Sequence, residues 1–433
     1  MRITSAFKRL LRLDGVHVTA VDFLPAMIVV TVALTRRKLI CPECGFSTRA
    51  AYEVDRADVS RWRHLDLGSW RLEVRACLRR LKCPTHGVRV EGVPFARHRS
   101  GFTTDFESLV AWLATKSDAT TITRLVRIDW ETVGRICGRV VADELDPGRL
   151  DDLFEIGVDE ISWRKHHRYL TLVTDHRRRK VIWGAPGKDA ATLDGFFDEL
   201  GEQRSAAIEA VSMDMGPAFA KSVRAEGHAP TAVICYDPFH VIKAMTEALE
   251  EVRRTIWQEL RHLPDPVIAR RFKGARWALL KNPGDLTDPQ AETLAAIRRN
   301  GGDMWRAYQL KEAGRAIFAG DLDADTIMVL LDRWCSRAQR SRLTPFVKAG
   351  ATVRAHREGI AAAIERGLSN GLIEGLNNKV RLIIRRAYGF HSANAALALV
   401  MLSCGPVNLL LPHERVHLRH RPRQPKRTTV RPQ

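Results

Sequence analysis

The spacing of apolar and polar residues divides the chain into segments of different secondary structure. Residues 1–100 contain stretches that alternate apolar and polar positions, such as Trp70–Cys77, which is typical of strands. From Thr103 to about Leu145 the apolar positions follow a helical period. Between Ile156 and Arg261 the pattern predicts three strands joined by short polar turns, a helix, a strand, a helix, a further strand and a long helix.

This last order of elements is that of the ribonuclease H-like fold, in which the first strand is central and lies beside the fourth. Asp159 lies in the first predicted strand and Asp214 ends the fourth, so the two carboxylates would face each other. Two neighbouring carboxylates repel unless a cation lies between them, which predicts a Mg²⁺ or Mn²⁺ site.

Two metal ions about 3.5–4 Å apart require a third carboxylate. The helical pattern over residues 369–386 offers Glu374, which would share one helix face with Asn378, Arg381 and Arg385. That face suits metal binding followed by contact with a DNA backbone. Glu374 also has an explanation that involves no metal, because an acidic residue in a first helical turn is stabilised by the helix dipole alone.

Two knuckles with the same spacing lie near the N-terminus, Cys41-Pro-Glu-Cys44 and Cys83-Pro-Thr-His86. Each would present two ligands on a tight turn, and two such turns complete a tetrahedral Zn²⁺ site. Four protein ligands leave no open position for chemistry, so the predicted zinc is structural. A redox pair or chance cysteines would not explain why His86 takes the fourth position.

The helical segment after residue 103 predicts a helix-turn-helix with its turn near residues 127–129. The second helix would carry Trp130 and Val133 inward, and Arg135 and Arg139 outward toward a DNA groove. Plain packing of three helices gives the same pattern and stays open as an alternative.

The charge distribution indicates that this folded protein binds a polyanionic partner. The formal net charge is +19 and the pI is about 10.0; residues 1–100 contribute +10 and the last 21 residues +6. The longest apolar run, residues 26–34, is half of the roughly 20 residues a membrane span needs. Eight cysteines in 433 residues are too few for a secreted disulfide framework, and no signal peptide is evident. We therefore expect a cytoplasmic nucleic-acid-binding protein.

Several motifs together resemble the ISL-three family of bacterial insertion-sequence transposases, which carry a DDE (Asp-Asp-Glu) active site. The resemblance extends from about residue 10 to residue 410 and rests on these segments: Cys41-Pro-Glu-Cys44-Gly, Trp62-Arg-His-Leu-Asp-Leu67, Gly157-Val-Asp-Glu160, Ser212-Met-Asp-Met215, Tyr236-Asp-Pro-Phe-His-Val-Ile-Lys243 and Asn370-Gly-Leu-Ile-Glu-Gly-Leu-Asn-Asn-Lys379. It implies that Asp159, Asp214 and Glu374 are the metal-binding triad of a ribonuclease H-like nuclease and strand-transferase. Asp237 and His240 resemble an auxiliary Asp-x-x-His element of other DDE transposases; helix capping by Asp237 is an equal alternative.

These observations predict a multidomain α/β protein with five parts. They are an N-terminal β region with the zinc ribbon (1–100), a helix-turn-helix (101–150), a ribonuclease H-like mixed-sheet catalytic core (151–245 and 368–410), an all-helical insertion (246–367) and a basic flexible tail (411–433). The tail would be either a phosphate-binding arm or a solubilising extension.

The expected function is transposition in the bacterial nucleoid. The enzyme would use two Mg²⁺ or Mn²⁺ ions and one structural Zn²⁺ to cut and join double-stranded DNA at terminal inverted repeats and target sites, as a homodimer or larger assembly without a membrane partner. A non-catalytic DNA-binding regulator and a nuclease without strand transfer are the alternatives.

Overall fold

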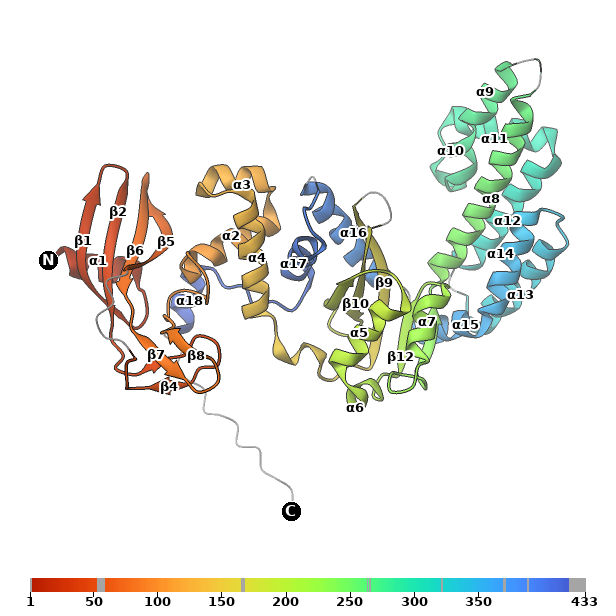
Figure 1. Cartoon of the computed structure of the whole chain (residues 1–433). Coiled ribbons are helices and arrows are strands. Elements are labelled where there is room, and N and C mark those ends of the chain that lie inside the picture. Colours follow the sequence, from red (N-terminus) through yellow and green to blue (C-terminus); the bar gives the residue numbers. More distant parts are fainter. Residues whose placement is uncertain are drawn as a thin grey trace. The chain divides into compact units, whose positions relative to one another are not determined.

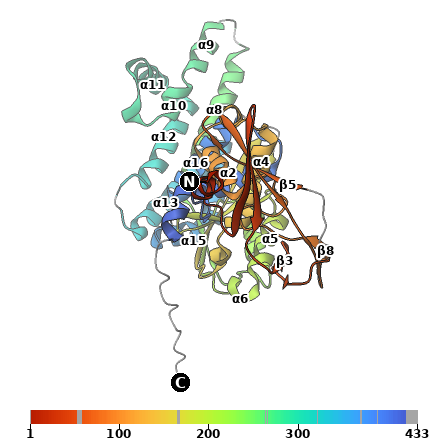
Figure 2. The ribbon, with the colours of Figure 1, turned by 90° about the vertical axis from the view of Figure 1, so that its left-hand side faces the viewer.

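The computed structural model describes residues 2–52, 59–164, 168–262, 264, 266–320, 322–368, 371–387 and 389–419 (Figures 1 and 2). Within its helices, the side chains of residues 266, 268, 271, 371–374 and 416–419 lie outside this description. The chain forms two compact units. Unit 1 comprises Met1–Arg149 and Val380–Gln433, and unit 2 comprises Leu150–Lys379. The structure is therefore a multidomain mixture of helices and sheets.

Unit 1 begins with a helix packed on a four-stranded sheet. Helix α1 (Ile3–Leu11) buries Phe7 and Leu11 against the sheet core. The strands follow the order β1-β2-β6-β5. Their bounds are β1 Val16–Leu24, β2 Met27–Leu34, β5 Val59–Leu67 and β6 Trp70–Cys77. The apolar run of residues 26–34 is thus a buried strand, as its β-branched composition favours.

Two small hairpins carry the cysteine knuckles. Strand β3 (Leu39–Ile40) pairs with β4 (Ser47–Thr48), and β7 (Arg80–Cys83) pairs with β8 (Gly87–Val90). Among the described residues, their shared core contains four buried ones, Leu39, Cys41, Leu81 and Cys83, with Ala51 packed against them. Such a core is too small to stabilise the hairpins by apolar burial alone.

Three helices follow, α2 (Thr104–Lys116), α3 (Ala119–Val126) and α4 (Trp130–Glu144). Each begins at a Thr or Asp whose side chain accepts a backbone N–H of the first turn, namely Thr103, Asp118 and Asp129. The structure therefore has the helix, turn and second helix that the sequence predicts.

Unit 1 also contains helices that we expected elsewhere. Helix α17 (Ala393–Cys404) places Ala398 and Leu402 in the same apolar core as Val110, Ile122 and Ile136 of α2–α4. The sequence predicts a catalytic core that extends to residue 410; in the structure, the residues from 380 onward are grouped with unit 1 by their contacts. Alanine-rich α17 offers a small apolar surface on every side, so its own pattern does not reveal its partner.

The beginning of the predicted flexible tail is also helical. Helix α18 spans Pro412–Arg419, inside the segment 411–433 that we expected to lack regular structure. Proline at its first position suits a helix start, and Arg415 forms ion pairs with Asp105 (3.6 Å) and Glu144 (3.3 Å). The prolines that motivated the prediction lie beyond it, at residues 422, 425 and 432, outside the described residues.

Unit 2 is built on a five-stranded sheet of order β11-β10-β9-β12-β13. Its strands are β9 Glu155–Arg164, β10 Arg168–Asp175, β11 Lys180–Pro186, β12 Ala210–Met213 and β13 Val233–Tyr236. The first three pair antiparallel, whereas β12 runs parallel to β9 and β13 runs parallel to β12. The predicted adjacency of the first and fourth strands is present, with β9 at the centre.

Helices connect and follow these strands. Helix α5 (Ala190–Leu200) buries Leu193, Phe196 and Phe197 in the sheet core. The other helices near the sheet are α6 Glu202–Ser205, α7 Pro217–Val223 and α15 Arg357–Glu365. Helix α16 spans Gly371–Arg386, and so it runs from unit 2 into the residues of unit 1.

The segment between α7 and α16 contains the predicted all-helical insertion. Helix α8 (Pro238–Leu260) leads into it from the end of β13 (Figure 1). The further helices are α9 Pro266–Gly274, α10 Arg276–Leu280, α11 Asp288–Asn300, α12 Gly302–Ile317, α13 Ala324–Gln339 and α14 Thr344–Ala355. They share one large apolar core with α8, which includes Met245, Trp334 and Phe346. No described helix of the chain is long and apolar enough to cross a membrane.

One glycine fixes how closely α15 approaches the sheet edge. A Cβ at Gly359 would lie 2.8 Å from the carbonyl oxygen of Ile234 in β13, and it would also meet the ring of Tyr236. We expect Gly359→Ala to lower the free energy of unfolding by about 1–3 kcal/mol, because backbone cannot yield as a flexible side chain does. Urea denaturation measures the change. Gly274→Ala, at a helical glycine with nothing within 4 Å, is the control and is expected not to destabilise.

Candidate active site and DNA-binding surfaces

Asp159 lies at the middle of the central strand β9, opposite Leu172 of β10. Its Oδ1 accepts the backbone N–H of Glu160 at 2.7 Å, and its Oδ2 accepts the side-chain amide of Asn377. Burial raises the pKa of the Asp159 carboxyl; the hydrogen bonds and nearby His240 oppose that shift, and the charge of Asp214 adds to it. The carboxylate is thus held in one orientation in an environment whose burial penalises its charged form.

Asp214 follows the adjacent parallel strand β12. The register pairs Ala210 with Glu155 and Ser212 with Gly157, so continuing it sets Asp214 level with Asp159. Asp214 Oδ1 accepts the backbone N–H of Gly216 at 3.0 Å. Neighbouring parallel strands therefore bring together the two carboxylates that the sequence pattern predicted would face each other.

Glu160 is a further acidic residue beside the carboxylate pair, and the sequence interpretation did not single it out as a site residue. Burial raises the pKa of Glu160, and the charge of Asp214 raises it further, while Lys188 and Lys243 lower it. The interaction with Asp214 places Glu160 close to the pair. Its carboxylate does not complete a close group of three with Asp159 and Asp214, because the described carboxylates form no such group with ligand atoms within 4.8 Å of one another.

The third predicted carboxylate, Glu374, belongs to helix α16, and its side chain lies outside the described residues. The same helix contributes Asn377, which is 6% exposed and donates to Asp159. We had selected Asn378 instead, since it lies four residues after Glu374, but Asn378 is exposed. The sequence could have indicated Asn377 as well, because it lies three residues after Glu374 and therefore falls on the same helix face. Arg381 and Arg385 are exposed on the same helix.

Asp237 and His240 lie at the start of α8, immediately after β13. Asp237 is 2% exposed, and its Oδ1 accepts the backbone N–H of Phe239 at 3.0 Å, which is the capping contact offered as the alternative. His240 contributes to the electrostatics of Asp159. The element therefore caps a helix and also places an imidazole near the carboxylate pair.

The four predicted zinc ligands come together in unit 1. One ligand atom each of Cys41, Cys44, Cys83 and His86 lies within 4.8 Å of the others. The distances are 3.5 Å between Cys44 Sγ and Cys83 Sγ, 3.6 Å between Cys83 Sγ and His86 Nδ1, and 3.8 Å between Cys41 Sγ and His86 Nδ1. Bonds of about 2.3 Å to a tetrahedral centre give edges of about 3.8 Å between sulfurs, so this donor set fits Zn²⁺. Among the described side chains, it is the one group of three or more potential metal ligands this close together.

The second helix of the helix-turn-helix presents fewer basic groups than predicted. Arg135 is exposed and donates to Thr132 Oγ1 at 2.7 Å, in the first turn of its own helix. The outward orientation predicted for Arg139 is not observed, because its Nη2 lies 2.6 Å from Oε1 of the fully buried Glu107 in α2. A buried carboxylate needs a partner, and Arg97 supplies a second one at 3.2 Å. Arg139 therefore connects α4 to α2.

Trp130 also differs from its predicted place. It is the first residue of α4 and is 52% exposed, since the buried face of the helix begins only at Thr132 and Val133. Its ring meets His391 edge to face, with centroids 5.2 Å apart. A Cβ on Gly134 would lie 3.2 Å from His391 Cε1, so the glycine permits this close approach.

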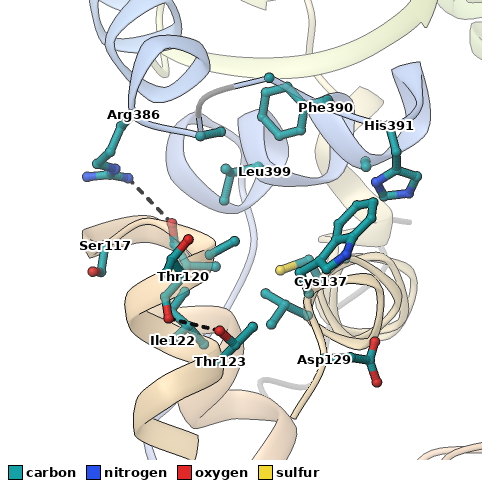
Figure 3. A pocket seen from close by; sticks show the side chains of 18 of the residues that line it. Ser117, Thr120, Ile122, Thr123, Asp129, Cys137, Arg386, Phe390, His391 and Leu399 are labelled. Atoms are coloured by element: carbon teal, nitrogen blue, oxygen red, sulfur yellow. Dashed lines mark hydrogen bonds between the residues drawn. The ribbon is translucent and has the colours of Figure 1, made fainter. Parts of the chain in front are cut away.

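A cavity of about 530 Å³ lies beside this contact, within unit 1. Figure 3 shows Arg386, Phe390, His391 and Leu399 on one side and Thr120, Ile122 and Thr123 of α3 across from them. Arg386 donates to the carbonyl oxygen of Thr115 at 2.8 Å, at the carboxyl end of α2. A cation there complements the dipole of α2 and attaches the end of α16 to the helix-turn-helix.

Known proteins resemble this chain both in the region of the carboxylate pair and in the helix-turn-helix. Residues 156–399 match a family model of the ISL3 DDE domain described as "Transposase", and residues 91–141 match the "Helix-turn-helix domain of transposase family ISL3". The transposase for insertion sequence element IS1557 of Mycobacterium tuberculosis is 42% identical over 402 residues, which is 88% of this chain and 90% of that protein. The transposase for insertion sequence element IS1001 of Bordetella parapertussis is 28% identical over 359 residues, 82% of this chain and 86% of that protein. Taken with the paired carboxylates and the helix-turn-helix, these matches show that the chain belongs to transposase family ISL3.

Proposed function

We propose that this transposase cleaves DNA at the terminal inverted repeats of an insertion sequence and joins the freed ends to target DNA, using Asp159, Asp214 and Glu374. The strand order of unit 2 supports a ribonuclease H-like catalytic core. The observation that carries the proposal is the Asn377–Asp159 hydrogen bond, since it attaches the helix of Glu374 to β9, the strand that contains Asp159 and lies beside β12 and Asp214.

The three carboxylates would hold two Mg²⁺ or Mn²⁺ ions, which would supply Lewis-acid stabilisation of the reacting phosphate and would lower the pKa of the attacking water. The Glu160 N–H and Asn377 fix the direction of both Asp159 oxygens before substrate arrives. In cleavage, a water oxygen bonds to phosphorus and the 3′ oxygen leaves as a hydroxyl. In joining, that hydroxyl attacks a target phosphate and displaces its 3′ oxygen.

DNA recognition would fall mainly to unit 1. We propose that Cys41, Cys44, Cys83 and His86 bind one structural Zn²⁺, and that the ribbon and the helix-turn-helix recognise the terminal repeats, with Arg135 toward the groove. Asn378, Arg381 and Arg385, exposed on α16, would contact DNA backbone. Synapsis of two ends requires at least a dimer, and the site of action would be the bacterial nucleoid.

Labelled terminal-repeat duplex incubated with the protein, target plasmid and Mg²⁺ tests this function. Strand-transfer products support the proposal. Cleavage without joining would indicate a nuclease, and binding without either would indicate a regulator, so each alternative has its own readout.

Asn377 offers a sharper test because Asn378 is a matched neighbour. Asn377→Ala removes the bond to Asp159, and we expect about a 10–100-fold weaker affinity for Mn²⁺, the size of effect reported for residues that orient metal ligands. Manganese titration followed by paramagnetic resonance measures it without any reaction. Asn378→Ala is expected to leave manganese affinity unchanged and to weaken DNA binding instead. Equal manganese affinity in the two variants would contradict the role given to Asn377.

A further inference from the structure

The charges of the helical insertion are segregated along the chain. Residues 253–281 contain eight Lys and Arg against two Asp and Glu. The rest of the insertion, residues 246–252 and 282–367, contains thirteen Lys and Arg against fourteen Asp and Glu. The positive charge is therefore confined to the end of α8, α9 and α10, and a concentration of this kind attracts a polyanion.

Five residues of this segment have exposed side chains and form a surface that we call the basic end. They are Arg261, Arg270, Lys273, Arg276 and Trp277. Trp277 is 55% exposed, with the Arg276 guanidinium 5.3 Å from its ring centre. Arg261 and Lys273 both lie over the ring of Trp257, at 4.9 Å and 5.7 Å. The cations are thus positioned over flat rings and still face solvent.

Packing explains other tryptophans of the insertion but not Trp277. Trp334 is 3% exposed, and its ring N–H donates to the Leu310 carbonyl oxygen at 2.8 Å, so it belongs to the core. A large ring left in solvent among cations offers a surface for sugar or base contact beside phosphate-binding groups.

Helix α8 separates the basic end from the carboxylate pair. Helix α8 begins next to β13, beside the strand that precedes Asp214, and its 23 residues end just before Arg261. At about 1.5 Å per residue the helix is about 34 Å long, which equals about one turn, or ten base pairs, of B-form DNA. Figures 1 and 2 show α9 at the end of α8 away from α5.

We propose that the basic end binds the backbone of duplex DNA about ten base pairs from the cleaved phosphodiester. This inference rests on the proposed function, because it assumes that the scissile phosphate lies at Asp159 and Asp214. It assigns to the insertion a share of substrate binding that is separate from the helix-turn-helix and the zinc ribbon.

The test compares two triple variants of the full chain. R261A/K273A/R276A removes three cations of the basic end, whereas R333A/R337A/K348A removes three exposed cations from α13 and α14 of the same insertion. We expect the first variant to reduce the slope of log affinity against log salt by about two to three, since each phosphate contact contributes about 0.9. Ethylation-interference signals about ten base pairs from the cleavage site should disappear, while those at the repeat-binding unit persist. Trp277→Ala should weaken the same region of the footprint.

Two outcomes would overturn the inference. One is equal salt slopes and footprints for the two triple variants; the other is loss of interference at a different distance from the cleavage site. Absence of terminal-repeat binding by the unaltered protein would instead refute the proposed function, so the two failures are distinguishable. Far-ultraviolet circular dichroism of both variants controls for folding.

Discussion

Asp159→Asn is expected to abolish both strand cleavage and strand transfer while leaving terminal-repeat binding intact. The substitution keeps the shape of the side chain and removes the charge that would hold a divalent cation. Metal ions contribute several kcal/mol of transition-state stabilisation, and each 1.36 kcal/mol is tenfold in rate. We therefore expect a loss of about 10³-fold or more in single-turnover cleavage of labelled DNA.

A second readout separates this effect from damage to the fold. Burial raises the pKa of Asp159, which means that its charged form is penalised in the metal-free protein. Asp159→Asn removes that penalty, so the melting temperature without metal should not fall, whereas the increase on adding Mn²⁺ should disappear. Asp198→Asn, at an exposed aspartate of α5 in the same unit, is the control and should behave like the unaltered protein. Cleavage by Asp159→Asn within tenfold of the unaltered rate would exclude Asp159 as a metal ligand.

Cys83→Ser is expected to unfold the ribbon and to eliminate specific binding of the terminal repeats. The hairpins β3–β4 and β7–β8 share a core of four buried residues, of which Cys41 and Cys83 are themselves ligands. Structural zinc contributes about 10–16 kcal/mol to the folding of isolated zinc-finger peptides, far more than this core can. Without metal, that core and a few backbone hydrogen bonds, such as Gly92 N–H to the Ile40 carbonyl oxygen at 2.9 Å, would remain between the two hairpins.

The matched control is Cys77, because it is exposed and outside the ligand group. Elemental analysis should find one zinc per chain in the unaltered protein and in Cys77→Ser, and none in Cys83→Ser. Hydrogen exchange should accelerate across residues 39–48 and 80–90 in Cys83→Ser, while strands of unit 2 remain protected. Full zinc content in Cys83→Ser would contradict the assigned ligand set.

The sequence by itself determined the elements whose signals are local. The two knuckles predicted the Cys41, Cys44, Cys83 and His86 cluster, because their spacing dictates a turn with two ligands. The order of strands predicted that Asp159 and Asp214 would be neighbours, since strand periodicity and connection lengths restrict the topology. The turn between α3 and α4 followed equally from the helical period on each side.

Only the tertiary structure decided which partners those elements take. Periodicity identified the outer face of α4, but Arg139 turns to Glu107, 32 residues away, because a buried carboxylate requires a compensating charge. It placed Glu374, Asn377 and Asn378 on one helix, yet contact with β9, more than 200 residues earlier, selected Asn377. It did not show that α17 packs with α2 and α4. In each case the choice depends on the energy of long-range contacts, and the local pattern of apolar and polar residues contains no information about that energy.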